Sequence, residues 1–105
     1  MTEAQKLYKE IEKLELEGEH DTALYELFKN LIDNIREENF EFCDEYIEIT
    51  LQGTLQSDVL VHMLNPLSNF KEELKNWDKL VDVSTSFFIE TYGEKRAADL
   101  LQVIR

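Results

Sequence analysis

The residues whose types and spacing come closest to a chemical site are four carboxylates: Glu41, Asp44, Glu45 and Glu48. At about 100° per residue, they share one narrow face of a helix. We call this group the acidic ridge. It could bind a divalent cation or a basic peptide, but metal-binding helical bundles also need a pair of Glu-x-x-His motifs on separate helices. That pair is absent here, so a solvated helix face is the main interpretation of the ridge itself.

Two smaller groupings could also do chemistry. Asp58 and His62 lie four residues apart, which is one turn of a helix, and a second ligand pair could complete a metal site with them. His20 is the only other histidine. Cys43 and His62 could act as nucleophile and base, but Cys43 falls among apolar residues and nearby acids raise a thiol pKa. We therefore expect no catalytic residue, no metal site and no cofactor.

Charge and composition exclude other classes of function. The net charge of −12 repels phosphates, so we expect neither nucleic-acid binding nor docking to an anionic membrane. The chain has no Gly-rich phosphate loop, serine elbow or paired-cysteine zinc motif. A single cysteine forms no internal disulfide, and no apolar run reaches the ~20 residues that span a bilayer. We expect a soluble, cytoplasmic protein.

The elements that carry these residues are expected to be helices. Only three glycines and one proline occur, and 43% of the residues are hydrophobic, enough for a core. We predict a single all-α domain over residues 1–105. Five to six short helices would form antiparallel hairpins, arranged as a compact bundle or a short tetratricopeptide-like solenoid.

Capping residues predict where the first helices begin and end. Thr2 and Gln5 form a capping-box pattern for the first helix, and Gly18 is a suitable left-handed residue to end it. Asp21 or Thr22 would cap the second helix. Asn39 would cap a third helix that runs to about residue 52. Apolar residues cover about 200° of that third helix, so we expect it to be packed from two sides.

Capping residues and the proline also predict the helices in the second half of the chain. Ser57 would cap a fourth helix, which Pro66 would end near Asn65. Residues 67–76 could be a short helix capped by Asn69 or an ordered loop. Asp78 would cap a fifth helix that ends at Gly93, and a last helix would start near residue 94.

The expected hairpins share features of their turns. Ala23 follows Gly18 by five residues, and Ala98 follows Gly93 by five. This pattern resembles the turn of a tetratricopeptide unit, where the small residue lets two helices approach. The resemblance covers about a third of the chain. Asp58 stands where the second hairpin would need the small residue, and Glu10 stands where the first helix would need one. The resemblance implies a hairpin architecture and no ligand residues.

The acids are unevenly distributed, and this leads to a functional prediction. Residues 1–52 carry a net charge of −10 and residues 53–105 a net charge of −2. We expect a non-catalytic protein–protein interaction module that offers an acidic face and aromatic anchors to a basic partner. The predicted partner-binding residues are Glu37, Glu38, Phe40, Glu41, Asp44, Glu45, Glu48, Phe70 and Trp77.

Two other functions stay open at this point. One is a small metal-binding or enzymatic helical bundle that uses Asp58, His62 and the acidic ridge. The other is a structural homo-oligomer. Six aromatics are many for a small domain, and most should lie in the core: Phe40, Phe42, Phe70, Trp77, Phe87 and Phe88. Some of Phe40, Phe70 and Trp77 would form an exposed patch, which would suit either a partner protein or a homodimer.

Overall fold

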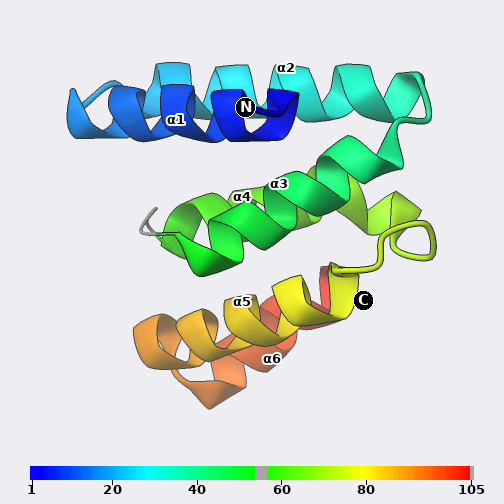
Figure 1. Ribbon diagram of the computed structural model, residues 1–105. Helices are drawn as coiled ribbons and strands as arrows, with labels where there is room; N and C mark the ends of the chain where they lie inside the picture. Colours follow the sequence, from blue (N-terminus) through cyan, green and yellow to red (C-terminus); the bar gives the residue numbers. More distant parts are fainter. Residues whose placement is uncertain (54–56, 105) are drawn as a thin grey trace. The chain divides into compact units, whose positions relative to one another are not determined.

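The computed structural model describes residues 1–53 and 57–104, although the side chains of 57–61, 100, 101, 103 and 104 lie outside that description. Within this part of the chain there are six α-helices, one 3₁₀ turn and no strand, which confirms the predicted all-α class (Figure 1). The chain divides into two compact units, Met1–Leu55 (unit 1) and Gln56–Arg105 (unit 2). The prediction of a single domain stays a prediction, and each unit is described by itself.

Unit 1 consists of α1 (Glu3–Leu16), α2 (His20–Arg36) and α3 (Phe40–Gln52). The three helices pack against one another, and short turns make consecutive helices antiparallel (Figure 1). Their buried side chains recur every three or four residues, as an amphipathic helix requires. The fully buried ones are Ala4, Ile11, Ala23, Leu27, Leu31, Cys43, Tyr46 and Ile47. The expected packing of α3 against the first hairpin is confirmed, whereas its packing against later helices stays a prediction.

The turn between α1 and α2 is closed by backbone hydrogen bonds. The amide of Gly18 donates to the carbonyl of Glu15 at 3.1 Å, and the amide of Glu19 donates to Leu14 at 2.9 Å. This pair of bonds is the Schellman motif, which needs a left-handed residue at its centre. Gly18 has φ +79°, so the predicted helix-ending role of this glycine is confirmed.

This tight turn also explains an error in the predicted start of α2. The helix begins at His20, directly after Glu19, and no side chain caps it. Asp21 and Thr22 therefore lie inside the first turn and not at the cap. The Schellman bonds have already turned the chain by residue 19, so the helix begins before the residues that favour a cap.

A second Schellman motif joins α2 to α3 without a glycine. The amide of Glu38 donates to Ile35 at 3.0 Å, and the amide of Asn39 donates to Asn34 at 2.8 Å. Glu38 adopts φ +59°, a conformation that a residue with a β-carbon rarely takes. Asn39 occupies the predicted cap position of α3, but its side chain bonds Asn34 Oδ1 at 2.9 Å and does not cap the helix.

Unit 2 contains α4 (Ser57–Leu67), a 3₁₀ turn (Ser68–Phe70), α5 (Trp77–Tyr92) and α6 (Glu94–Ile104). α5 packs against both α4 and α6. The predicted end of α4 near Asn65 is wrong, because Pro66 lies inside the last turn of the helix. Residues Met63, Leu64 and Leu67 are all fully buried, so burial of the last turn offsets the hydrogen bond that proline lacks.

Of residues 67–76, for which the sequence left a short helix or an ordered loop open, Leu67 ends α4 and Ser68–Phe70 form a short 3₁₀ helix. The expected helix from Asn69 towards Trp77 does not form. After the 3₁₀ turn, residues 71–76 form turns that Leu74 holds down with 5% exposure. α5 then begins at Trp77, after Asn76, so Asp78 lies in its first turn and the predicted cap is wrong by two residues. Gly93 ends α5 with φ +85°, as predicted, and α6 begins at Glu94.

Candidate functional site

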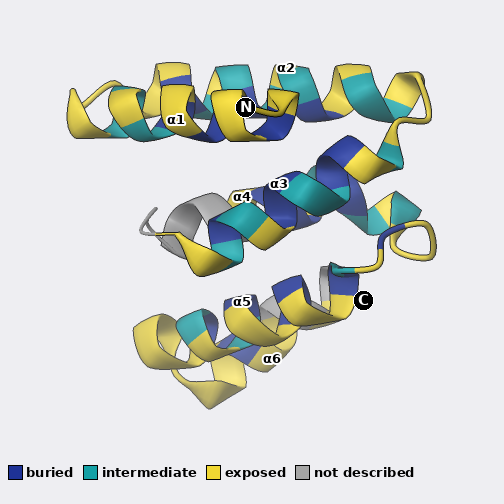
Figure 2. Ribbon diagram, viewed as in Figure 1, coloured by how far each residue is buried: buried dark blue, intermediate teal, exposed yellow. Residues whose placement is uncertain are grey.

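The acidic ridge lies on α3, and its four carboxylates differ in exposure. α3 carries buried, half-buried and exposed positions along its length (Figure 2). Of the ridge carboxylates, Glu41 and Glu48 are exposed, while Asp44 and Glu45 are half-buried. Two more acids, Glu37 and Glu38, are exposed in the turn that precedes α3. The ridge and this turn therefore form one acidic segment over residues 37–48.

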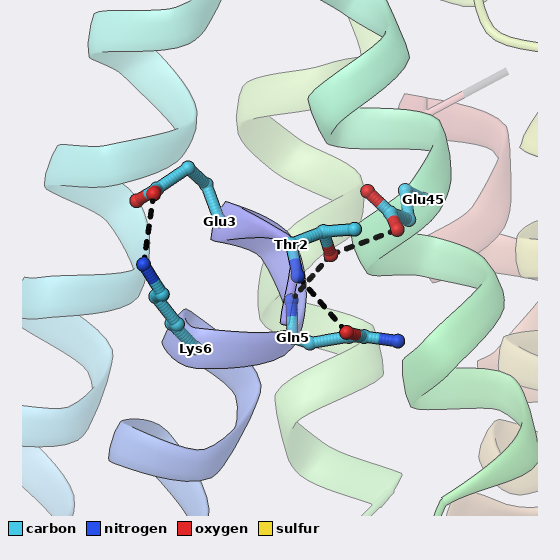
Figure 3. A network of polar contacts seen from close by, with 5 residues as sticks. All are labelled: Thr2, Glu3, Gln5, Lys6 and Glu45. Carbon is cyan, nitrogen blue, oxygen red and sulfur yellow. Dashed lines mark hydrogen bonds and ion pairs between the residues drawn. The ribbon is translucent and has the colours of Figure 1, made fainter.

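Glu45 has a structural role that its place in the ridge does not reveal. Its Oε1 accepts a hydrogen bond of 2.9 Å from the hydroxyl of Thr2, which lies 43 residues away in sequence (Figure 3). The same hydroxyl accepts the backbone amide of Gln5 at 3.2 Å, and the Gln5 side chain accepts the amide of Thr2 at 3.0 Å. The predicted capping box is thus confirmed, and the hydrogen bond from Thr2 to Glu45 links it to α3.

The predicted aromatic anchors do not form an exposed aromatic patch. Trp77 is only 6% exposed and lies on the buried stripe of α5, so the expectation that it is exposed is wrong. Its position, three and four residues before Leu80 and Val81, places the indole on the core side of the helix. Phe40 and Phe70 are half-buried and belong to different units.

A polar cavity of about 240 Å³ in unit 1 was not predicted. It is lined by Glu3, Lys6, Leu7, Glu10, Asn30, Asn34, Asn39 and Phe42. Lys6 forms an ion pair of 3.3 Å with Glu3, which also lines the cavity. Three carboxamides and two carboxylates therefore surround a hollow that has a single cationic group.

The asparagines of this cavity form a chain of hydrogen bonds along α2. Asn30 Nδ2 donates to the carbonyl of Glu26 at 2.7 Å, and Asn34 Nδ2 donates to the carbonyl of Asn30 at 2.7 Å. Asn39 Nδ2 then donates to Asn34 Oδ1 at 2.9 Å. Each of the three carboxamides uses its NH₂ group in these bonds, and the Oδ1 of Asn34 already accepts from Asn39. The carboxamide oxygens are the groups of these side chains that can accept from a further donor.

One sequence signal could have pointed to this cavity. Asparagine is unfavourable inside a helix, because its side chain competes for backbone hydrogen bonds. Asn30 and Asn34 nevertheless lie one turn apart in the second half of α2. The cavity residues that α1 supplies could not be found in this way, since their position beside the asparagines depends on how α1 and α2 pack.

Cys43 is a buried thiol with a strongly perturbed pKa. Burial raises its pKa from the ordinary value of 9.0 to about 11, and the charge of Asp44 adds to the rise. A thiol that stays protonated at neutral pH is a poor nucleophile. The raised pKa agrees with the expectation that Cys43 packs as an apolar side chain.

The two histidines lie in different settings. His20 Nδ1 lies 2.5 Å from Glu15 Oε2, across the turn between α1 and α2. His62 is exposed on α4, and the side chain of its expected partner Asp58 lies outside the described residues. Among the side chains that are described, no three His, Cys, Asp or Glu residues gather in a way that could hold a metal ion.

No family model, no curated protein and no solved structure matches the chain. Over the described residues, none of the helices has the length and apolar character needed to cross a lipid bilayer.

Proposed function

We propose that this chain is a non-catalytic protein–protein interaction module whose unit 1 binds a basic segment of a partner protein. The observation that carries the proposal is the charge of that unit. Its 15 acidic and 5 basic residues give a net charge of −10, and none of their side chains is buried. Such a surface raises the rate at which a positively charged partner associates.

The segment 37–48 is the best candidate for the contact surface. Glu37, Glu41 and Glu48 are exposed and do not share the structural role of Glu45. The segment also contributes Asn39 and Phe42 to the polar cavity of unit 1. A partner that docks on the segment could place a lysine or arginine donor among the carboxylates and carboxamides of this cavity.

A peptide-display selection against the full chain would test this function. We expect enrichment of peptides that carry several Lys and Arg residues, with binding that weakens as ionic strength rises. The ridge variant E37Q/E41Q/E48Q should bind these peptides more weakly. The matched control E17Q/E90Q/D99N removes the same charge from exposed positions elsewhere and should bind them nearly as well as the wild-type chain. Equal binding by all three chains would contradict the proposed location.

The metal-binding or enzymatic bundle remains the alternative of a different class. It would use Asp58, His62 and the acidic ridge. Thermal melts with a series of divalent ions separate the two functions, because a site well saturated with its ion stabilises the folded chain by about 3 kcal/mol. A shift with one ion, abolished in H62A, would favour the metal-binding function.

A further inference from the structure

The polar cavity of unit 1 contains three acceptor groups that the chain itself leaves unused. Within the described part of the chain, the carboxylate of Glu10 takes part in no hydrogen bond or ion pair. The side-chain oxygens of Asn30 and Asn39 likewise accept no hydrogen bond from any described residue. One carboxylate and two carboxamide oxygens are therefore ready to accept hydrogen bonds from a ligand.

The charge of the lining favours a ligand with a single positive charge. Glu3, Glu10 and Lys6 are the charged residues of the lining and give it a net charge of −1. Lys6 already forms its ion pair with Glu3, so the charge of Glu10 is the one left unbalanced (Figure 3). Divalent cations prefer more oxygen ligands and charge than one free carboxylate supplies. A monovalent cation that carries N–H donors matches both the charge and the acceptors.

The three acceptors enter the cavity from three separate elements. Glu10 lies on α1, Asn30 lies on α2, and Asn39 lies in the turn before α3. The three N–H bonds of an ammonium group diverge, whereas the N–H bonds of a guanidinium group lie in one plane. Acceptors on several sides of a hollow suit divergent donors, because a guanidinium group has no donor above or below its plane.

The apolar part of the lining fits the stem that carries such a group. Leu7 is 5% exposed and Phe42 is 8% exposed, so both belong to the core and present only a small surface to the cavity. The aliphatic stem of a lysine covers apolar surface of this kind while its ammonium group stays among polar atoms. The cavity, of about 240 Å³, has room for one such side chain.

We propose that the polar cavity of unit 1 binds a primary alkylammonium group in preference to a guanidinium group. This inference rests on the proposed function, since it names lysine as the side chain by which the basic partner enters the cavity. Asn39 and Phe42 belong to both the cavity and the segment 37–48, so one partner can contact both. A free alkylamine is the other source of the same group.

Two labelled peptides of equal length and charge test the preference, one with lysine and one with arginine as its only basic residue type. Fluorescence anisotropy with the full chain should give a Kd about fivefold lower for the lysine peptide, as one additional hydrogen bond provides. E10Q and N30L should each remove most of this difference while keeping the helical content. The control E17Q removes an exposed carboxylate of unit 1 that does not line the cavity, and it should retain the difference.

Small cations then test the cavity without the rest of a peptide. n-Butylammonium and n-propylguanidinium correspond to the side chains of lysine and arginine. In NMR spectra of the full chain, millimolar n-butylammonium should shift the side-chain amide signals of Asn30 and Asn39, and n-propylguanidinium should shift them much less. In E10Q the shifts should be lost, because the unbalanced charge has been removed.

The outcomes separate this inference from the proposed function. Equal Kd values for the two peptides, a lysine preference that persists in E10Q and N30L, or an absence of shifts with n-butylammonium each overturns the ammonium site. If E37Q/E41Q/E48Q still loses both peptides in that case, the proposed function stands. Shifts with n-butylammonium in a chain that binds neither peptide would support the ammonium site with a free amine as its ligand, and would contradict the proposed function.

Discussion

The ring of Tyr8 occupies the space that a side chain at Gly53 would need. A β-carbon at Gly53 would lie 1.8 Å from the Tyr8 hydroxyl oxygen and 2.6 Å from the ring carbon that bears it. The backbone of Gly53 is extended, with φ −92°, so glycine is needed here for space and not for a left-handed turn. The close contact between Tyr8 and Gly53 therefore joins α1 to the residue that ends α3.

Replacing Gly53 with alanine should therefore destabilise the chain by about 1–3 kcal/mol, because the new methyl group overpacks the contact. Tyr8 is buried and its ring lies 6.3 Å from that of Tyr46, so it has little freedom to move away. Urea unfolding of G53A measures the change. In a Tyr8→Ala background the same substitution should cost nearly nothing, and an unchanged cost there would show that Tyr8 is not the reason.

Glu38 offers a stabilising substitution. Its φ of +59° strains a residue with a β-carbon, and glycine removes that strain. E38G should raise the free energy of unfolding by about 0.5–1 kcal/mol, measured by urea unfolding.

Gly18 is the matched control for Glu38. It has the same place in the first Schellman motif, with φ +79° and open space where a β-carbon would lie. G18A should lower the free energy of unfolding by about 1 kcal/mol through backbone strain alone. If E38G were destabilising while G18A were neutral, left-handed strain would not control these turns.

The hydrogen bond between Thr2 and Glu45 predicts a measurable coupling. T2A should cost about 1 kcal/mol, because it removes the cap of α1. E45A should cost less in the T2A background than in the wild-type chain, since its partner is already lost. A double-mutant cycle by thermal or urea unfolding gives the coupling. Glu48→Ala, which changes an exposed ridge carboxylate on the same helix, should show no coupling to T2A.

The raised pKa of Cys43 predicts how stability changes with pH. The thiol ionises near 9.0 in the unfolded chain and near pH 11 in the folded one, so the folded state holds its proton longer. Its contribution is complete below pH 9 and is lost as pH rises from 9 to 11. The loss should be on the order of 2 kcal/mol.

The control for this prediction is C43A. Its stability should fall less steeply than that of the wild-type chain between pH 9 and 11. Burial also raises the pKa of Tyr46, but that residue is present in both chains and its effect cancels in the difference. Parallel pH profiles for the two chains would contradict the assigned role of Cys43.

Local signals in the sequence were sufficient for much of the fold. Thr2 and Gln5 form the capping box as predicted, since both partners lie within one helical turn. Gly18 and Gly93 end their helices because a left-handed backbone favours glycine. Glu38 adopts the same conformation without a residue type that signals it. Pro66 does not end α4 where its local preference predicts, because burial of its neighbours outweighs that preference.

The candidate site was less predictable, since it depends on contacts between distant segments. The exposure of Glu41 and Glu48 follows from helical spacing. The hydrogen bond between Thr2 and Glu45 does not follow from spacing, because the two residues meet only when α1 packs on α3. The burial of Trp77 likewise depends on where α5 begins, and a start at Asp78 would have left the indole in a loop.

The central claim, that the acidic segment 37–48 binds a basic partner, is tested most directly by affinity capture from lysate of the source organism. The wild-type chain, E37Q/E41Q/E48Q and the control E17Q/E90Q/D99N are compared at low and high ionic strength, with identification by mass spectrometry. The account predicts a basic protein held by the wild-type and control chains at low salt, released at high salt and absent from the ridge variant. Equal capture by all three chains, or capture that persists at high salt, would contradict it.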